Sequence, residues 1–228
     1  MENIKISDSE GSSGSLCLPK IQNRFLDRRT LPYATKNKLK NYGSDLLKQA
    51  YEEVCLLLNK THKKQVTVTQ FEKLLLKEIK LHTKLEVHQS FWIGNMNIDL
   101  FFPSIKGSCL QTKDSGFQFN GAAFNGVGIE VNGEIHEQYV SMLKDNFKYA
   151  VLEDMGIMIF AIDNEDINSV SVQNIIKDLC NFKKVDSRSK QRLLDRIYLQ
   201  TIVAHRKLIF ENRLTLPMTI LKALGYEE

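Results

Sequence analysis

Residues 127–162 constrain the fold more than any other part of the sequence, because they carry the succession strand, helix, strand. The run VGIEV, 127–131, is apolar apart from one carboxylate. Residues 137–155 are expected to form a helix that ends at Gly156, and IMIFAI, 157–162, predicts a second buried strand. This succession predicts a right-handed crossover between two parallel strands.

A β-hairpin is predicted immediately before this unit. LEVHQSFWIGNMNIDLFF alternates and is rich in aromatic and β-branched residues, with Gly94-Asn95 between its halves. We expect strands near 85–92 and 96–102, ended by Pro103. A hairpin followed by parallel strands makes a mixed sheet, so the predicted fold class is α/β.

Helices are predicted on both sides of these strands. Residues 35–60 have apolar side chains at helical spacing, and Ser44 is a plausible N-cap for the better half. A second helix is predicted to begin near Thr69, where Glu72 completes a capping box. Its buried side is expected to comprise Phe71, Leu74, Leu75 and Ile79.

The chain is expected to divide into four regions. They are a disordered tail over 1–24, a helical extension over 25–66, a core over 67–165 and a basic helical region over 166–228. Within the core, 104–126 is expected to be a long loop, with room for a short strand near FQFNG.

Composition excludes several classes of protein. The 228 residues are 43% hydrophobic and 25% charged, which is typical of a soluble globular chain. No run approaches the roughly 18 apolar residues of a membrane span, and the first twenty residues contain no apolar signal segment. The four cysteines form no C-x-x-C pair, so we expect reduced thiols and a cytoplasmic location, with no membrane partner.

Two acids inside apolar strands carry the chemical prediction. Asp99 lies in IDLFF and Glu130 in VGIEV. Burying a carboxylate is costly unless it is paired or bound to a metal. Two such acids on one sheet would repel each other, and Mg²⁺ would remove that conflict because it binds carboxylate and phosphate oxygens. His136, just beyond the strand that carries Glu130, would position or deprotonate a water molecule.

The order of these residues resembles a known family. Asp99 precedes Glu130-Val131-Asn132-Gly133-Glu134-Ile135-His136, and Asp145, Lys148 and Gly156 follow before the last strand. Upstream stand Glu72 at a helix start and Gln89 on the first strand. This order is similar to that of the very-short-patch-repair (Vsr) endonucleases and their relatives in the restriction-endonuclease-like superfamily, over about residues 69–165.

The resemblance implies a restriction-endonuclease-like mixed β-sheet core flanked by helices, with extra N- and C-terminal helices. It implies a Mg²⁺-dependent deoxyribonuclease, with Mn²⁺ as a possible substitute. Asp99, Glu130 and the carbonyl of Val131 would hold the ion, and His136 would act on water. Glu72, Gln89 and Asn132 would support the site.

Three departures from the family pattern bear on this prediction. Asn132 stands where the relatives have Asp and the wider superfamily has Lys, so it supplies neither charge nor a base. Lys148 replaces an Arg that would pair bidentately with Asp145. The 31 residues from Asp99 to Glu130 are a long separation, so 104–126 resembles an insertion.

Structural explanations stay open beside the functional ones. Asp99 can anchor the hairpin, Glu72 can serve only the capping box, and Gln89 can be a plain edge-strand residue. Asn132 can belong only to its turn, and His136 to a helix entry. Asp145 and Lys148 are interpreted as structural, since a continuous helix from His136 would turn Asp145 to the opposite face.

The predicted partner is DNA. The whole chain has a net charge of +4, which permits such a partner without arguing for one. Ten basic and five acidic residues lie between 183 and 228, so the C-terminal region is more basic than the rest. The predicted DNA contacts are Gln89, Lys148, Lys183, Lys184, Arg188, Lys190 and Arg192.

Two other functions remain open. The chain can be a nuclease subunit of a larger transposition or defence complex, active only with a co-encoded protein partner. It can also be a DNA-binding module that has lost its chemistry, which Asn132 would favour.

Overall fold

The computed structural model describes residues 39–61, 68–108, 123–133, 139–210 and 217–223. Its elements are α3 (Ser44–Thr61), α4 (Gln70–His82), β1 (His88–Ile93), β2 (Met96–Gly107), β3 (Phe124–Asn132), α5 (Tyr139–Asp154), β4 (Met158–Asp163), η3 (Asn164–Asp166), α6 (Ser169–Asn181), β5 (Lys183–Lys184), α7 (Ser187–Phe210) and α8 (Met218–Ala223). The predicted tail over 1–24 and the strand near FQFNG lie outside these ranges.

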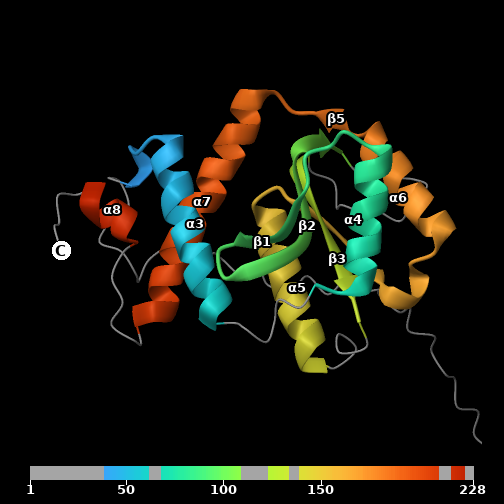
Figure 1. Ribbon diagram of the computed structural model, residues 1–228, viewed down its shortest axis with the longest axis horizontal. Coiled ribbons are helices and arrows are strands. Elements are labelled where there is room, and N and C mark those ends of the chain that lie inside the picture. The colour runs from blue at the N-terminus through green and yellow to red at the C-terminus, as the bar shows by residue number, and fades with distance from the viewer. Residues whose placement is uncertain (1–38, 62–67, 109–122, 134–138, 211–216, 224–228) are drawn as a thin grey trace, which may run out of the picture.

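The sheet is mixed, as predicted (Figure 1). Its order is β1-β2-β3-β4, and β5 pairs with β2. β1, β3 and β5 run antiparallel to β2, whereas β3 and β4 are parallel and joined through α5. The predicted hairpin is confirmed, and so is the predicted order of strand, helix and parallel strand.

β2 is longer than the sequence predicted. It continues through Pro103 to Gly107, so the expectation that Pro103 ends the strand was wrong. The β2–β3 register shifts between Phe102 and Lys106, and proline is tolerated at such irregularities because it lacks a donor for the ladder. β3 likewise begins at Phe124, so both ends of the expected loop 104–126 are strand.

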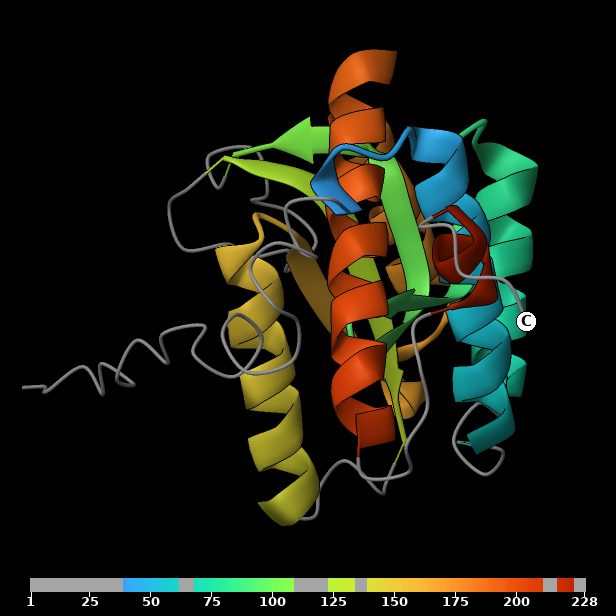
Figure 2. The same cartoon turned by 90° about the vertical axis from the view of Figure 1, so that its left-hand side faces the viewer.

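Two hydrophobic clusters cover the two faces of the sheet. One contains buried side chains of α3, α5, α7 and α8, including Val54, Leu152 and Ile197. The other contains those of α4 and α6, including Leu75 and Ile175. Figure 2 shows α4 and α5 on opposite sides of the strands. Segments from the predicted extension, core and C-terminal region therefore share one hydrophobic cluster.

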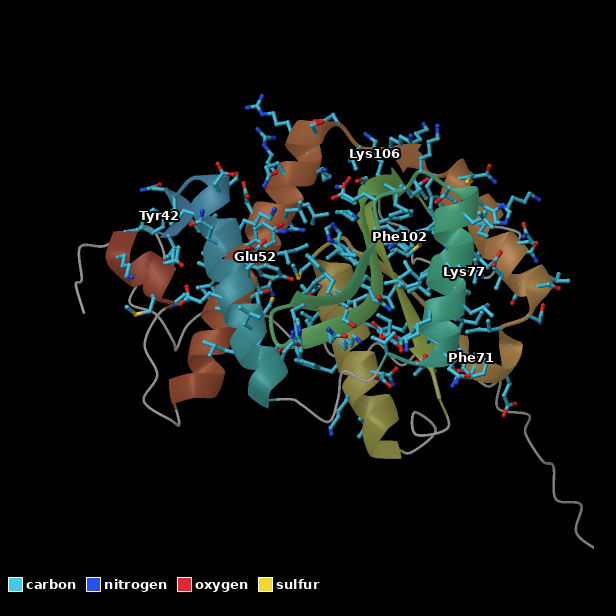
Figure 3. All side chains as sticks on the ribbon, viewed as in Figure 1. Tyr42, Glu52, Phe71, Lys77, Phe102 and Lys106 are labelled. Atoms are coloured by element: carbon cyan, nitrogen blue, oxygen red, sulfur yellow. The ribbon has the colours of Figure 1, made fainter. Side chains whose placement is uncertain are left out.

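The helix α4 begins as predicted but buries a narrower face. Thr69 and Glu72 form the reciprocal capping box. The buried residues are Glu72, Leu75 and Ile79. Phe71 and Leu74 are 40% and 50% exposed, so the expectation that they are buried was wrong. Figure 3 shows Phe71 near the N-terminal end of α4, beside the end of the sheet where β3 finishes.

Helix α3 buries the apolar face that its spacing predicted, with Leu47, Ala50 and Val54 in the core. Ser44, the predicted N-cap, is the first residue of α3, and its hydroxyl donates to Asp195 on α7 at 2.8 Å. This bond ties α3 to α7.

The ends of α5 and the C-terminal region complete the core. Gly156 has φ +74° after α5, and Ile157 N donates to Leu152 O at 2.9 Å, which is the predicted glycine-terminated helix end. The described part of the C-terminal region contains the helices α6, α7 and α8, and also the two-residue strand β5, which the sequence analysis did not predict. Within the described residues, no helix has the length and apolarity required to cross a bilayer.

Candidate active site

Asp99 and Glu130 lie on neighbouring strands at one end of the sheet. The β2–β3 ladder pairs Leu100 with Ile129, so the next step of the register places Asp99 opposite Glu130. There the Asp99 side chain replaces a ladder partner, because its Oδ2 accepts a hydrogen bond from Val131 N at 2.8 Å. The folded sheet therefore brings together the two acids that the sequence placed 31 residues apart.

The strand opposite Asp99 is strained. Gln89 pairs with Leu100 and Phe91 with Ile98, so the register places Ser90 across from Asp99. Ser90 has φ +51°, a left-handed conformation that a residue other than glycine seldom adopts. Strained residues of this kind cluster at functional sites, where the surrounding structure holds them in place.

Glu130 is buried, and Lys148 binds one of its two carboxylate oxygens. Its side chain is 7% exposed, and its Oε2 lies 2.6 Å from Lys148 Nζ. Its Oε1 accepts no hydrogen bond within the part of the chain that the structure describes. Burial raises the pKa of Glu130 to about 8, the charges of Asp99 and Asp145 add to that rise, and Lys148 opposes it. Among the described residues, one buried oxygen of this carboxylate therefore lacks a hydrogen-bond donor.

Helix α5 supplies three polar residues to Glu130 that the sequence analysis had not placed there. Asp145, Lys148 and Tyr149 are spaced i, i+3 and i+4, so they share one helix face. Burial raises the pKa of the Tyr149 hydroxyl, and the negative charges of Glu130 and Asp145 add to the rise. The spacing was the available signal, but extrapolating the helix from His136 pointed this face away from the site.

Glu72 approaches from the opposite layer. Its Oε1 accepts a hydrogen bond from Thr69 N at 3.0 Å, so the carboxylate closes the capping box. Burial raises the pKa of Glu72, and the charge of Asp99 adds to the rise even though the Thr69 amide opposes it. The same side chain therefore caps α4 and belongs to the electrostatic environment of Asp99.

The remaining predicted site residues have different surroundings. Asn132 ends β3, and its Oδ1 is buried with no hydrogen-bond partner among the described residues. Val131 uses its amide for Asp99. Gln89 is exposed on β1. His136 lies in 134–138, outside the described residues, so its predicted role stays a prediction.

The donor set fits a hard divalent cation in part. No group of three or more His, Cys, Asp or Glu side chains that would hold a metal ion is found among the residues that the structure describes. Mg²⁺, however, is commonly held by one or two carboxylates, with water and substrate phosphate completing the shell. Oε1 of Glu130, which has no hydrogen-bond partner among the described residues, supplies a buried carboxylate oxygen of this kind on the strand next to Asp99.

A basic surface lies at the other end of β2. Exposed Lys106, Lys183 and Lys184 lie there on paired strands, and exposed Arg188 and Arg192 follow on the N-terminal turns of α7. We call these five cations the basic edge. Lys106 stands directly opposite Lys183 in the β2–β5 pairing. Like charges in that relation repel, so the pair favours an anionic partner. Lys106 is seven positions after Asp99, which is about 23 Å along an extended strand.

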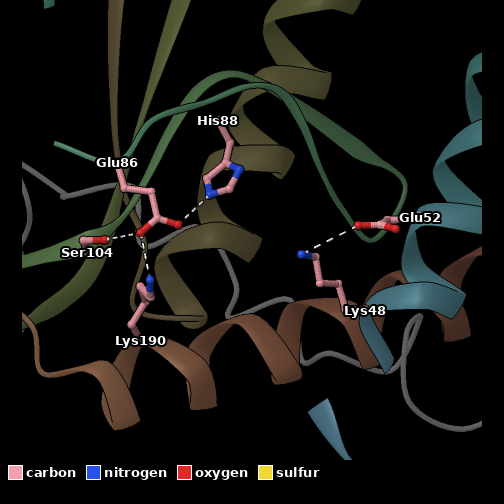
Figure 4. A network of polar contacts seen from close by, with 6 residues as sticks. All are labelled: Lys48, Glu52, Glu86, His88, Ser104 and Lys190. Atoms are coloured by element: carbon pink, nitrogen blue, oxygen red, sulfur yellow. Dashed lines mark hydrogen bonds and ion pairs between the residues drawn. The ribbon is translucent and has the colours of Figure 1, made fainter. Parts of the chain in front are cut away.

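Two of the predicted DNA contacts are engaged inside the protein. Lys148 is 15% exposed and bound to Glu130. Lys190 Nζ lies 2.8 Å from Glu86 Oε2, which also accepts a hydrogen bond from Ser104 (Figure 4). Burial raises the pKa of Glu86, but hydrogen bonds from Lys190, Ser104 and His88 hold it below its ordinary value. Lys190 therefore joins α7 to the sheet.

Comparison of the chain with models of known families, with curated proteins and with solved structures gives no match.

Proposed function

We propose that this protein is a Mg²⁺-dependent endonuclease that hydrolyses phosphodiester bonds in DNA. The observation that carries the proposal is the pairing of Asp99 with Glu130, whose buried Oε1 has no hydrogen-bond donor among the described residues. The resemblance of the sequence to the Vsr-like endonucleases supports the same reaction. In this proposal the mixed sheet is a restriction-endonuclease-like core, and its neighbouring strands β2 and β3 carry the two acids.

The proposed reaction gives each residue of the site a role. Asp99, Glu130 and the Val131 carbonyl would hold the ion, which, when bound, would lower the pKa of water and stabilise charge on the phosphate. His136 would hold or deprotonate the attacking water. Glu72 and Gln89 would keep Asp99 and its strand in place, and Asn132 would offer an amide oxygen beside them.

In this proposal DNA binding and catalysis use different surfaces of the protein. The acids around Asp99 repel a polyanion, so affinity has to come from elsewhere. The basic edge supplies positive charge that would neutralise phosphates. A duplex that contacts both the basic edge and the acids would span about 23 Å, or roughly seven base pairs at about 3.4 Å each.

The experiment that tests the function is cleavage of supercoiled, nicked and mismatched DNA in Mg²⁺ or Mn²⁺ by four proteins. They are the wild type, Glu130→Gln, Asp99→Asn and the control Glu52→Gln, which removes a carboxylate from an exposed ion pair with Lys48. We expect cleavage by the wild type and the control, and a loss of at least about a hundredfold in the two site variants. Cleavage that persists unchanged in Glu130→Gln refutes the proposal.

A DNA-binding module without chemistry is the second candidate. Asn132 favours it, and so does Lys148, which already provides Glu130 with a counter-ion. Titration with Mn²⁺ separates the two functions, because a binding isotherm that disappears in Asp99→Asn argues for an ion site. Cleavage that appears only when a co-encoded protein is added would instead support the subunit of a larger complex.

A further inference from the structure

Lys148 binds one of the two carboxylate oxygens of Glu130. Its Nζ is 2.6 Å from Oε2 of Glu130, and the two side chains are 15% and 7% exposed. Oε1 of the same carboxylate has no hydrogen-bond partner among the described residues. An ion bound at Oε1 would therefore share Glu130 with a buried ammonium group.

The charges around the site favour binding of both an ion and the Lys148 ammonium to Glu130. Asp99 and Asp145 both act on Glu130 with negative charge, and Asp99 also acts on Glu72. Lys148 is the cation that offsets these acids at Glu130. The acids attract a divalent cation, whereas Lys148 repels it across a short, poorly solvated distance.

Lys148 can also be reached from outside the protein. A groove of about 550 Å³ lies between the turn joining β1 to β2 and α5. Met96, Lys144, Asp145, Phe147 and Lys148 are among the residues that line it. Lys144 and Lys148 both line this groove, so a phosphate group bound there would lie near two lysines, and lysine binds phosphate as a flexible point charge.

We infer that Lys148 is the resident counter-charge of Glu130, which keeps the affinity for a divalent cation low until a phosphate group enters the groove and takes over the ammonium. The inference rests on the ion site of the proposed function. It assigns to Lys148 a coupling role: ion and substrate phosphate bind together, because each relieves a charge that opposes the other.

Neutralising Lys148 should change the affinity for a divalent ion in a predictable direction. A single positive charge repels a divalent ion twice as strongly as it repels a proton at the same place. Removing that charge therefore favours the ion over the proton that competes for Glu130. A lysine needed only to orient Glu130 would give the opposite result, because its loss would disorder a ligand.

The test is an isothermal calorimetric titration of the full chain with Mn²⁺ alone. Lys148→Met keeps the apolar stem, Lys148→Gln keeps a donor for Glu130, and Lys148→Arg keeps the charge. We expect Mn²⁺ to bind at least tenfold more tightly to Lys148→Met and Lys148→Gln than to the wild type, and within threefold of wild type to Lys148→Arg. If Lys148→Met does not fold, Lys148→Gln decides the result.

The outcomes separate this inference from the function it rests on. Unchanged or weaker Mn²⁺ binding in folded Lys148→Gln, with wild-type cleavage intact, overturns the role of Lys148 alone. Tighter Mn²⁺ binding in a protein that cleaves no DNA supports the role of Lys148 and counts against the nuclease. Absence of Mn²⁺ binding in every variant overturns both.

Discussion

Asp99 Oδ2 accepts a hydrogen bond from Val131 N at 2.8 Å, so a carboxylate assigned to chemistry also fastens the end of β3 to β2. Strand attachment and the proposed ion binding therefore depend on one side chain. Its two roles can be separated by substitution, because asparagine retains an acceptor oxygen and loses the charge.

Asp99→Ala should destabilise the protein by about 1–3 kcal/mol, since the Val131 amide loses its acceptor. Asp99→Asn should cost less, because the amide oxygen can accept the same bond. Urea unfolding of both variants in the absence of metal measures the difference. Equal destabilisation would show that the charge of Asp99, and not its hydrogen bond, holds the strand.

The stability of the metal-free protein should depend on pH through Glu130. Burial raises the pKa of Glu130 to about 8 in the folded chain, above its ordinary value, so the folded state binds the proton more tightly. The resulting stabilisation is fully present below the unfolded pKa of about 4.3 and is lost as pH rises through 8. Between these limits, the wild type should lose stability relative to Glu130→Gln by up to about 1.4 kcal/mol per pH unit.

Denaturant unfolding of the two proteins from pH 5 to 8.5 measures that slope. Glu72, whose pKa is also raised by burial, is present in both and largely cancels in the difference. Parallel stability curves would contradict the raised pKa of Glu130.

The hairpin turn is fastened to α7 by Thr201. Its buried Oγ1 accepts a hydrogen bond from Gly94 N at 2.8 Å and donates one to Ile197 O at 2.9 Å. Thr201→Val leaves the Gly94 amide without a buried acceptor and should cost about 1–3 kcal/mol. Thr201→Ser keeps the hydroxyl and should cost less in thermal or urea unfolding; the reverse order would rule out the hydrogen bond as the cause.

The basic edge predicts a salt-dependent affinity for DNA. Replacing Lys183 and Lys184 by Gln should weaken binding to any duplex and reduce the slope of log K against log salt by up to about 2, because two phosphate contacts are lost. Fluorescence anisotropy at several salt concentrations checks this. Lys48→Gln, which removes an exposed cation of α3, should leave the slope unchanged. An unaltered slope in the double variant would place the DNA elsewhere.

Local sequence patterns predicted the helix ends, the hairpin and the strands, because these features depend on interactions between residues close in the sequence. Gly94-Asn95 specified the hairpin, Gly156 the end of α5, and Thr69 with Glu72 the start of α4. Alternation of apolar residues placed Asp99 and Glu130 on strands, and strand pairing then set them side by side. These features depend on a few neighbouring residues.

Features that depend on distant packing were not predicted. Pro103 was expected to end a strand, but an irregularity in the ladder accommodates it. Phe71 and Leu74 have the spacing of a buried face, yet the sheet covers only the stripe of Leu75 and Ile79. The face of α5 that carries Lys148 was expected to point away from the site, because the helix was extrapolated from His136, whereas the structure pairs Lys148 with Glu130.

The hydrophobic cluster shared by α3, α5, α7, α8 and the hairpin has a consequence for dissection of the chain. A fragment limited to 67–165 would contain Asp99, Glu130 and Lys148, but it would leave Trp92, Ile98 and Leu152 facing solvent. Such a minimal piece should aggregate rather than act as an autonomous module. The flanking helices thus support the strands that carry the two acids. Grafting the proposed site onto another scaffold would require grafting these helices as well.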